Sequence, residues 1–186
     1  MRKILVFENV TLDGFMAGPN GEIDWAIRDD EVTEFSKEGQ DSTDMFLFGR
    51  VTYDMMASFW PTPMGKSVNP VFAEVLNNTP KIVFSTTLKK ADWQHTEVVP
   101  EITKKGILSL KQQPGKNMLI FGSGSLVDQL TKLELIDEYQ LMVNPVVLGK
   151  GIPLFKNITD RLKLTLVGNR TFKSGIVFLR YQPVMS

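Results

Sequence analysis

The chain reads Asn117-Met118-Leu119-Ile120-Phe121-Gly122-Ser123-Gly124-Ser125-Leu126 at the point that decides its fold. The apolar run 118–121 stops at a glycine-serine turn, and apolar residues then recur at helical spacing, which predicts a strand, a tight turn and a helix. In a parallel sheet this arrangement presents the first N–H groups of the helix at the carboxyl end of the strand, where an anion can bind close to the glycines. A short connection without a ligand would use the same residues, so other stretches must decide between the two interpretations.

Composition narrows the class of protein. The 186 residues, 42% of them hydrophobic, suffice for one sizeable core, so we expect a single domain over residues 1–186. The 21 basic and 21 acidic side chains balance, and we therefore expect no nucleic-acid partner. The absence of cysteine and the single histidine exclude disulfides and a multi-histidine site, and we expect no metal. No apolar stretch approaches bilayer length, so we expect a cytoplasmic protein without a membrane partner.

The order of the expected elements indicates the fold class. Buried strands are expected over residues 4–10, 45–48, 81–84 and 118–121, with helices between them that include residues 70–77 and 101–111. From residue 136 onward the pattern changes to β-rich runs over residues 139–148, 162–172 and 176–181. Helices that alternate with strands and then give way to strands predict an α/β fold with a mostly parallel central sheet, flanking helices and antiparallel strands at its C-terminal edge.

Small polar residues follow three of these strands, which end at Phe48, Phe84 and Phe121. Because the carboxyl ends of parallel strands meet at one edge of a sheet, we expect the residues that follow to line one crevice. These residues are Arg50, Thr52, Ser85, Thr86, Ser123 and Ser125. An arginine fork beside neutral donors suits a pyrophosphate and a ribose 2′-phosphate, so the sequence predicts an anionic nucleotide here.

Four motifs in this order resemble the dihydrofolate reductase superfamily over nearly the full length of the chain. Gly18-x-Asn20-Gly21-x-x-x-Trp25 resembles the loop that covers the nicotinamide, and Gly49-Arg50-x-Thr52-Tyr53 resembles the turn that binds cofactor phosphates. Ser85-Thr86 is similar to the strand end near the adenosine 2′-phosphate, and Gly122-Ser123-Gly124 stands in place of a Gly-Gly turn against the nicotinamide and pyrophosphate. The resemblance implies a three-layer dihydrofolate reductase-like fold with NADPH as its cofactor. The cofactor-binding residues that it implies are Ala17, Gly49, Arg50, Thr52, Ser85, Thr86, Gly122, Ser123, Gly124, Ser125 and Leu126.

Within that superfamily the chain resembles stand-alone relatives of the reductase domain of the riboflavin-pathway deaminase-reductase. Thr11-Leu12-Asp13-Gly14 is similar to the Ser-x-Asp-Gly signature of that branch, and Pro145 to Gly151 resembles its late strands. The zinc deaminase half is missing. The chain departs from the branch at Phe121, where riboflavin-pathway reductases commonly have a glutamate, and at Ser123, which replaces the second glycine of the turn.

The resemblance implies hydride transfer from NADPH to a small heterocyclic or carbonyl substrate, such as 5-amino-6-(5-phosphoribosylamino)uracil of riboflavin biosynthesis. The candidate acids for the accompanying proton are Asp13, Asp30 and Glu31, and the candidate substrate-binding residues are Trp25, Phe35 and Trp60. Each has a structural alternative: Asp13 holds its turn, the other acids cap a helix, and the aromatic rings only pack.

Two alternative functions stay open: a non-catalytic nucleotide-binding module of the same fold, and a dihydrofolate reductase. We expect a homodimer, for which the apolar run 141–148 is the candidate strand edge.

Overall fold

The computed structural model describes residues 1–40 and 42–184, except for the side chains of residues 36–40. The strands are β1 Ile4–Thr11, β2 Phe15–Ala17, β3 Thr43–Gly49, β4 Lys81–Phe84, β5 Thr96–Val99, β6 Asn117–Phe121, β7 Glu138–Asn144, β8 Ile152–Pro153, β9 Leu164–Thr171 and β10 Val177–Pro183. The helices are α1 Asp30–Gln40, α2 Arg50–Phe59, α3 Pro63–Val68, α4 Pro70–Asn78, α5 Lys104–Gln112 and α6 Gly124–Lys132.

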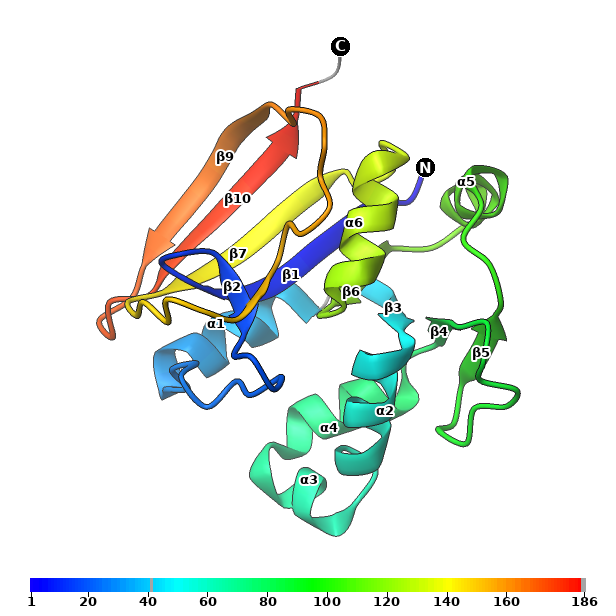
Figure 1. Cartoon of the computed structure of the whole chain (residues 1–186). Coiled ribbons are helices and arrows are strands. Elements are labelled where there is room, and N and C mark those ends of the chain that lie inside the picture. Colours follow the sequence, from blue (N-terminus) through cyan, green and yellow to red (C-terminus); the bar gives the residue numbers. More distant parts are fainter. Residues whose placement is uncertain (41, 185–186) are drawn as a thin grey trace.

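One eight-stranded sheet runs through the molecule in the order β5-β4-β3-β6-β1-β7-β10-β9 (Figure 1). The first six strands in this order, β5, β4, β3, β6, β1 and β7, are parallel to one another. Strand β10 is antiparallel to both β7 and β9. The short strands β2 and β8 form a separate antiparallel pair. The predicted α/β fold, with a mostly parallel sheet and antiparallel C-terminal strands, is confirmed.

Helices cover both faces of this sheet because successive strand residues point to opposite sides. Leu47 of β3 packs in one cluster with Leu126 of α6, whereas its neighbour Phe48 packs in another with Met56 of α2. Phe35 of α1 packs against the C-terminal strands. The central strands β1, β3, β4 and β6 carry apolar residues on both faces, which is why apolar runs located them in the sequence.

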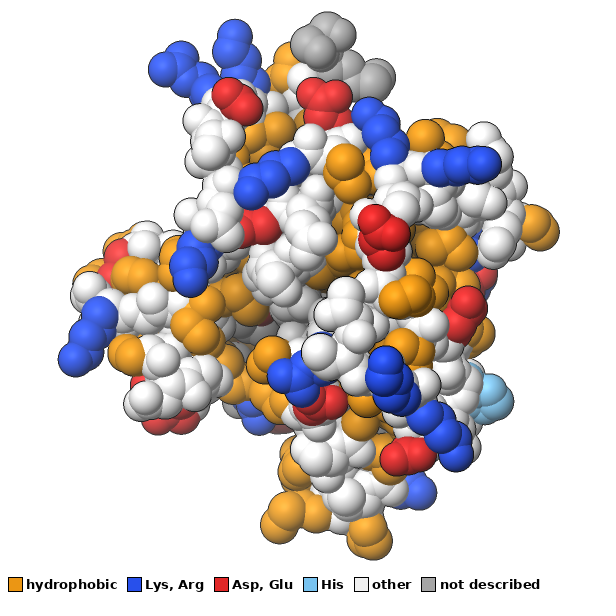
Figure 2. Space-filling view, turned by 45° about the vertical axis from the view of Figure 1, so that its right-hand side comes forward, with side chains coloured by type: hydrophobic (Ala, Val, Ile, Leu, Met, Phe, Trp, Pro, Cys, Tyr) orange, Lys and Arg blue, Asp and Glu red, His pale blue; other side chains and the backbone are white. Residues whose placement is uncertain are grey.

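The surface carries both signs of charge. Figure 2 shows Lys and Arg side chains interspersed with Asp and Glu over the face in view, and hydrophobic side chains at the tip formed by α3. Met64 and Val68 of α3 are among the exposed apolar residues. In the described part of the chain no helix is long and apolar enough to cross a membrane.

Several expected boundaries need correction. The strand expected over residues 139–148 ends at Asn144, because Pro145 has no N–H to continue a ladder. The helix expected from residue 101 begins at Lys104, since the Thr103 hydroxyl accepts the Gly106 N–H and caps it. Strand β5 and helix α3 were not predicted.

The proposed strand edge for dimerisation is wrong, because β7 is hydrogen-bonded to β1 on one side and to β10 on the other. The open edges of the sheet are β5 and β9. The homodimer itself stays a prediction.

Candidate functional site

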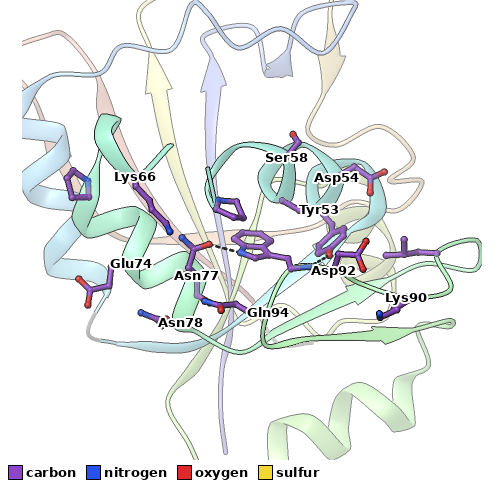
Figure 3. Close-up of a pocket in the computed structure, with 15 residues that line it drawn as sticks. Tyr53, Asp54, Ser58, Lys66, Glu74, Asn77, Asn78, Lys90, Asp92 and Gln94 are labelled. Atoms are coloured by element: carbon purple, nitrogen blue, oxygen red, sulfur yellow. Dashed lines mark hydrogen bonds between the residues drawn. The ribbon is translucent and has the colours of Figure 1, made fainter. Parts of the chain in front are cut away.

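An open cleft of about 900 Å³ lies between α2, α4 and the segment 88–94 (Figure 3). The Trp93 Nε1–H donates to Asn77 Oδ1 at 2.7 Å, and the Trp93 backbone N–H donates to the Tyr53 hydroxyl at 3.2 Å. None of the predicted site residues lines this cleft. Because these buried polar groups already have partners within the chain, the cleft does not require a ligand to satisfy them.

The predicted crevice is instead built at the carboxyl ends of β4, β3 and β6, which are adjacent and parallel. Gly49 at the end of β3 pairs in register with Phe84 at the end of β4. The Gly49 N–H also donates to Ser123 Oγ at 3.0 Å, which joins β3 to the turn after β6. The predicted convergence of these three strand ends is confirmed.

Two glycines allow close backbone packing in this turn. A Cβ on Gly49 would lie 2.1 Å from Ser123 Oγ, and a Cβ on Gly122 would lie 3.0 Å from Thr52 Cγ2. Gly122 and Ser123 both have positive φ, 70° and 77°, a conformation that favours glycine and is uncommon for serine. The family motifs therefore come into contact in two places: Gly49 packs against Ser123, and Gly122 packs against Thr52.

The two helices that begin at this edge have no side-chain cap. Gly49 and Ser123 are the N-cap residues of α2 and α6, and neither helix has a capping side chain or an acidic residue in its first turn. By contrast, side chains accept N–H groups at the start of α1, α3, α4 and α5. Uncapped N–H groups and the positive end of the helix dipole favour an anion at both positions.

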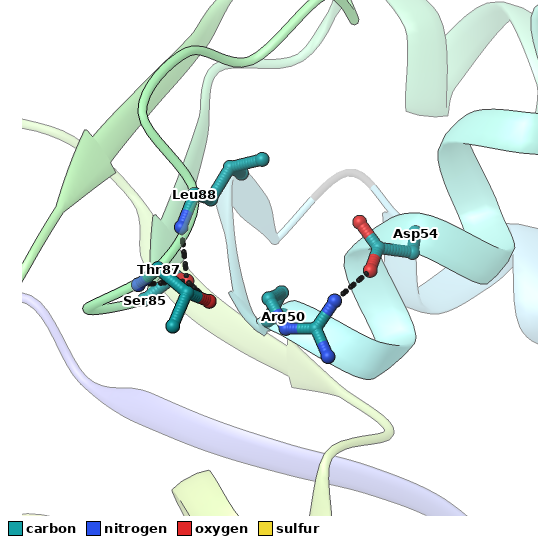
Figure 4. A network of polar contacts seen from close by, with 5 residues as sticks. All are labelled: Arg50, Asp54, Ser85, Thr87 and Leu88. Carbon is teal, nitrogen blue, oxygen red and sulfur yellow. Dashed lines mark hydrogen bonds and ion pairs between the residues drawn. The ribbon is translucent and has the colours of Figure 1, made fainter.

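The predicted phosphate ligands from β3 and β4 lie beside these turns (Figure 4). Arg50 Nη1 forms an ion pair with Asp54 Oδ2 at 2.7 Å, and both side chains are about half exposed. Ser85 Oγ accepts the N–H groups of Thr87 and Leu88 at 3.2 and 3.0 Å, so it closes its own turn. Thr86 in that turn is exposed. Arg50 is thus an accessible cation at this edge, held by an ion pair that solvent screens.

Strand β2 contacts the same turn. A Cβ on Gly124 would lie 2.9 Å from Met16 Sδ, and the next residue, Ala17, is buried in the β2–β8 pair. Ser125 in the first turn of α6 is exposed, whereas Leu126 is buried in the core. The segment that precedes the Gly18 loop therefore covers the start of α6.

Asp13 holds a turn. Its carboxylate accepts the Thr11 hydroxyl at 2.6 Å and the N–H groups of Gly149 and Leu148 at 2.8 and 3.3 Å. The Thr11 hydrogen bond, followed by these backbone bonds, lowers the pKa of Asp13 below its usual value. The geometry matches the turn-holding alternative and gives no support to proton donation by Asp13.

The acids at the start of α1 have structural contacts too. Glu31 Oε2 accepts the Lys173 N–H at 3.1 Å and lies near Arg170, while Asp30 is exposed. Phe35 lies one helical turn beyond Glu31, on the same face as expected, and its ring contacts Phe178 with centroids 4.7 Å apart. This face of α1 therefore contacts the β9–β10 hairpin, and the predicted roles toward a substrate stay predictions.

The two candidate stacking rings differ. Trp60 packs edge-on against Phe72 of α4 at 4.8 Å and donates its Nε1–H to Met56 Sδ. Trp25 has a buried Nε1 atom with no hydrogen-bond partner. Phe121, the residue in place of the family glutamate, stacks on Phe7 at 5.7 Å. Of the two tryptophans, Trp25 has a donor that a ligand would satisfy.

Sequence reasoning missed Glu8 of β1. Its side chain is buried, and burial raises its pKa to about 8, an effect that the N–H groups of Asn9 and Gly122 partly offset. Oε2 of this carboxyl has no hydrogen-bond partner. The available signal was a glutamate inside the apolar run 4–10, where a buried strand otherwise has no acidic residue. In the described residues no group of three or more His, Cys, Asp and Glu side chains could hold a metal ion.

The fold and this sheet edge define a dihydrofolate reductase-like α/β protein. The structure of dihydrofolate reductase from Enterococcus faecalis complexed with NADP(H) aligns with a TM-score of 0.66 at 15% identity, covering 98% of this chain and 97% of that chain. A Shewanella sp. PV-4 protein provisionally assigned to riboflavin biosynthesis aligns with a TM-score of 0.79 at 23% identity, covering 98% of this chain and 99% of that chain.

Sequence comparison gives the family. The RibD C-terminal domain family matches residues 2–178. The uncharacterized protein YyaP of Bacillus subtilis (strain 168) is 35% identical over 182 residues, which cover 97% of this chain and 94% of that protein. The chain therefore belongs to the RibD C-terminal domain family, as the resemblance of its motifs predicts.

Proposed function

We propose that this protein is an NADPH-dependent reductase that transfers a hydride to a small heterocyclic or carbonyl substrate. The observation that carries the proposal is the pair of uncapped helix N-termini, α2 and α6, at adjacent strand ends that the Gly49–Ser123 hydrogen bond joins. Each offers backbone donors to an anion, and together they suit a ligand with more than one phosphate group. The family contains reductases of this fold, and dihydrofolate reductase-like proteins typically bind NADPH.

The residues at the edge fit the parts of a dinucleotide. The glycine turn and the first N–H groups of α6 would hold the pyrophosphate, where a Cβ on Gly49 or Gly122 would occupy space already filled. Arg50 and the exposed Thr86 would hold the 2′-phosphate. When bound, NADPH supplies the hydride.

For the substrate, we propose a planar ring that lies against the apolar side chains at the end of β6, where Phe7 and Phe121 stack with an interplanar angle of 12°. Trp25, whose buried Nε1 has no hydrogen-bond partner, stays a candidate donor to the substrate. Riboflavin intermediates such as 5-amino-6-(5-phosphoribosylamino)uracil are the first substrates to test, although the glutamate common in such reductases is absent. The second candidate function is a nucleotide-binding module without turnover, which the structural contacts of Asp13 and Glu31 favour.

The test is a titration of the purified protein with NADPH and NADH, followed by quenching of tryptophan fluorescence. We expect saturable binding with a preference for NADPH, and Arg50→Ala should weaken NADPH by about 10- to 100-fold because it removes a charge-assisted hydrogen bond. NADH affinity should change little.

Asp54→Asn is the matched control, because it also breaks the Arg50–Asp54 pair but keeps the cation. This variant should bind NADPH at least as well as the wild type. Equal weakening of NADPH and NADH by Arg50→Ala would count against a 2′-phosphate contact. Failure of the wild type to bind either nucleotide would refute the reductase assignment, and binding without oxidation across the substrate panel would favour the non-catalytic module.

A further inference from the structure

Glu8 has a polar atom that the chain leaves without a partner. The residue is only 9% exposed, and its Oε2 is buried without a hydrogen bond. Other buried acids of the sheet are satisfied: Glu138 of β7, 3% exposed, receives hydrogen bonds from Arg180, Gln140 and Gln182. Buried polar groups in folded proteins are nearly always paired, so an unpaired one beside the end of β6 points to a missing ligand.

The carboxyl lies directly beside the glycine turn. Strands β1 and β6 pair with Phe7 next to Phe121, so the following residues, Glu8 and Gly122, are neighbours where β6 ends and β1 continues. The Gly122 N–H interacts with the Glu8 carboxyl. The same turn begins α6 and carries the uncapped N–H groups.

Residue alternation along β1 places Glu8 on the α6 side of the sheet. Val6 and Val10, two positions before and after it, pack in the same cluster as Leu126 and Val127 of α6. The Glu8 side chain therefore lies between β1 and the first turn of α6, on the face of the sheet opposite Phe7 and Phe121.

The protonated carboxyl offers one donor to a ligand. Burial keeps it neutral near pH 7, because its pKa is raised to about 8. A neutral carboxyl has one acceptor oxygen, which suits the Gly122 N–H, and one hydroxyl, which the unpaired Oε2 would carry. An ionised carboxylate would instead place an unpaired buried charge beside a phosphate site.

We propose that Glu8 is a ligand-binding residue of the cofactor site, where its protonated Oε2 donates a hydrogen bond to the nucleotide bound at the Gly122 turn. The inference rests on the proposed function. It predicts that NADPH binds to the protonated form and that binding takes up a proton at alkaline pH. Affinity for the nucleotide is therefore linked to the charge of a residue that the sequence motifs do not include.

The elements packed around Glu8 carry few other titratable side chains. Tyr139 of β7 donates to or accepts from Thr131, and burial raises its pKa to about 12. Asp13, beyond the end of β1, has a lowered pKa and stays ionised. On α6, Asp128 accepts a hydrogen bond from Asn157, and Lys132 lies in the last turn. Strands β2 and β6 carry no titratable side chain, and β1 carries only Glu8.

The experiment measures the dissociation constant of NADPH from pH 7 to pH 9.5 by tryptophan fluorescence. The 2′-phosphate changes little in charge over this range, since a second pKa of about 6 leaves about nine-tenths of it doubly ionised already at pH 7. If only the protonated form binds, the wild-type dissociation constant should rise about 30-fold over this interval. Glu8→Gln keeps a donor and an acceptor without a charge, so its dissociation constant should stay flat.

Glu138→Gln is the matched control, because it neutralises a buried glutamate outside the site and should keep the wild-type pH dependence. Calorimetry of the wild type in two buffers of different ionisation enthalpy gives a readout that needs no variant, with proton uptake approaching one per NADPH at pH 9. A pH-independent wild-type affinity, no proton uptake, or a Glu8→Gln protein that retains the rise would overturn the role of Glu8 and leave the reductase proposal intact. No NADPH binding to the wild type at any pH would overturn both.

Discussion

Gly49→Ala tests whether the contact between β3 and the turn after β6 shapes this edge of the sheet. Gly49 has φ −83° and ψ 162°, which any residue adopts, so alanine introduces no backbone strain and the outcome depends on space alone. The added Cβ would lie 2.1 Å from Ser123 Oγ, the atom that accepts the Gly49 N–H at 3.0 Å. The serine hydroxyl must therefore rotate away and give up that hydrogen bond.

The cost follows from these two changes. Leaving a buried N–H unpaired costs about 1–3 kcal/mol, and an unfavourable rotamer adds about 0.5–1.5 kcal/mol. We expect Gly49→Ala to lower the free energy of unfolding by about 2–4 kcal/mol, which corresponds to a fall in Tm of about 5–15 °C for a domain of this size. Urea denaturation followed by circular dichroism measures it.

A double-mutant cycle separates this clash from a general effect of alanine. Ser123→Ala removes Oγ and leaves Cβ, which lies 3.4 Å from the new Cβ on Gly49. In that background Gly49→Ala should cost less, with a coupling energy of about 1–2 kcal/mol. Gly168→Ala on β9, where the nearest atom to a new Cβ is 3.6 Å away, is the control and should change stability by about 0.5 kcal/mol or less. The reasoning would be refuted if Gly49→Ala had the same free energy of unfolding as the wild type. It would also be refuted if Gly49→Ala lowered that free energy as much in the Ser123→Ala background as in the wild type.

Two further predictions concern pH. Lys81 is buried, its Nζ donates to the carbonyl groups of Leu76 and Thr79 at 2.7 and 2.6 Å, and burial lowers its pKa from 10.5 to about 8. Between pH 8 and pH 10.5 the unfolded state then binds more protons than the folded state. The free energy of unfolding of the wild type, relative to that of Lys81→Met, should therefore rise with pH by up to about 1.4 kcal/mol per pH unit. Urea denaturation at several pH values measures it, and equal pH dependence of the two proteins would contradict the prediction. Asp13→Asn should destabilise the protein at neutral pH, and the difference from wild type should vanish in acid as pH falls through the lowered folded-state pKa of Asp13. If Asp13 were the proton donor instead, the variant would lose turnover at unchanged stability.

The parallel strands were predictable because burial on both faces leaves a continuous apolar run. Residues 45–48, 82–84 and 118–121 are such runs, and each is followed by glycine or hydroxyl residues. Strand β5 escaped prediction because it is a four-residue edge strand, Thr96–Val99, with no buried residue and only two apolar positions, Val98 and Val99. Its place in the sheet comes from pairing with β4, the preceding strand, and the β-propensity of so short a segment does not reveal that pairing.

The cofactor edge was predictable for a different reason. Glycine and hydroxyl residues at strand ends have a local meaning, since they mark turns with close backbone approach. Side chains that depend on long-range packing were not predictable: the two roles considered for Glu31 were a ligand contact and a helix cap, and neither includes the Lys173 N–H that the turn between β9 and β10 supplies as its partner. Asp13 likewise binds N–H groups of Leu148 and Gly149, some 135 residues further along the chain.

The position of Glu8 bears on the missing family glutamate. Riboflavin-pathway reductases commonly carry that glutamate at the position of Phe121, whose ring here stacks on Phe7 and contacts Phe72. That face of the sheet is thus apolar at the end of β6. Glu8 brings a carboxyl to the same glycine turn from the neighbouring strand and from the opposite face, through the N–H of Gly122. The carboxyl of Glu8 and the ring of Phe121 therefore lie on opposite faces of the sheet at this turn, so Glu8 does not take the place of that glutamate.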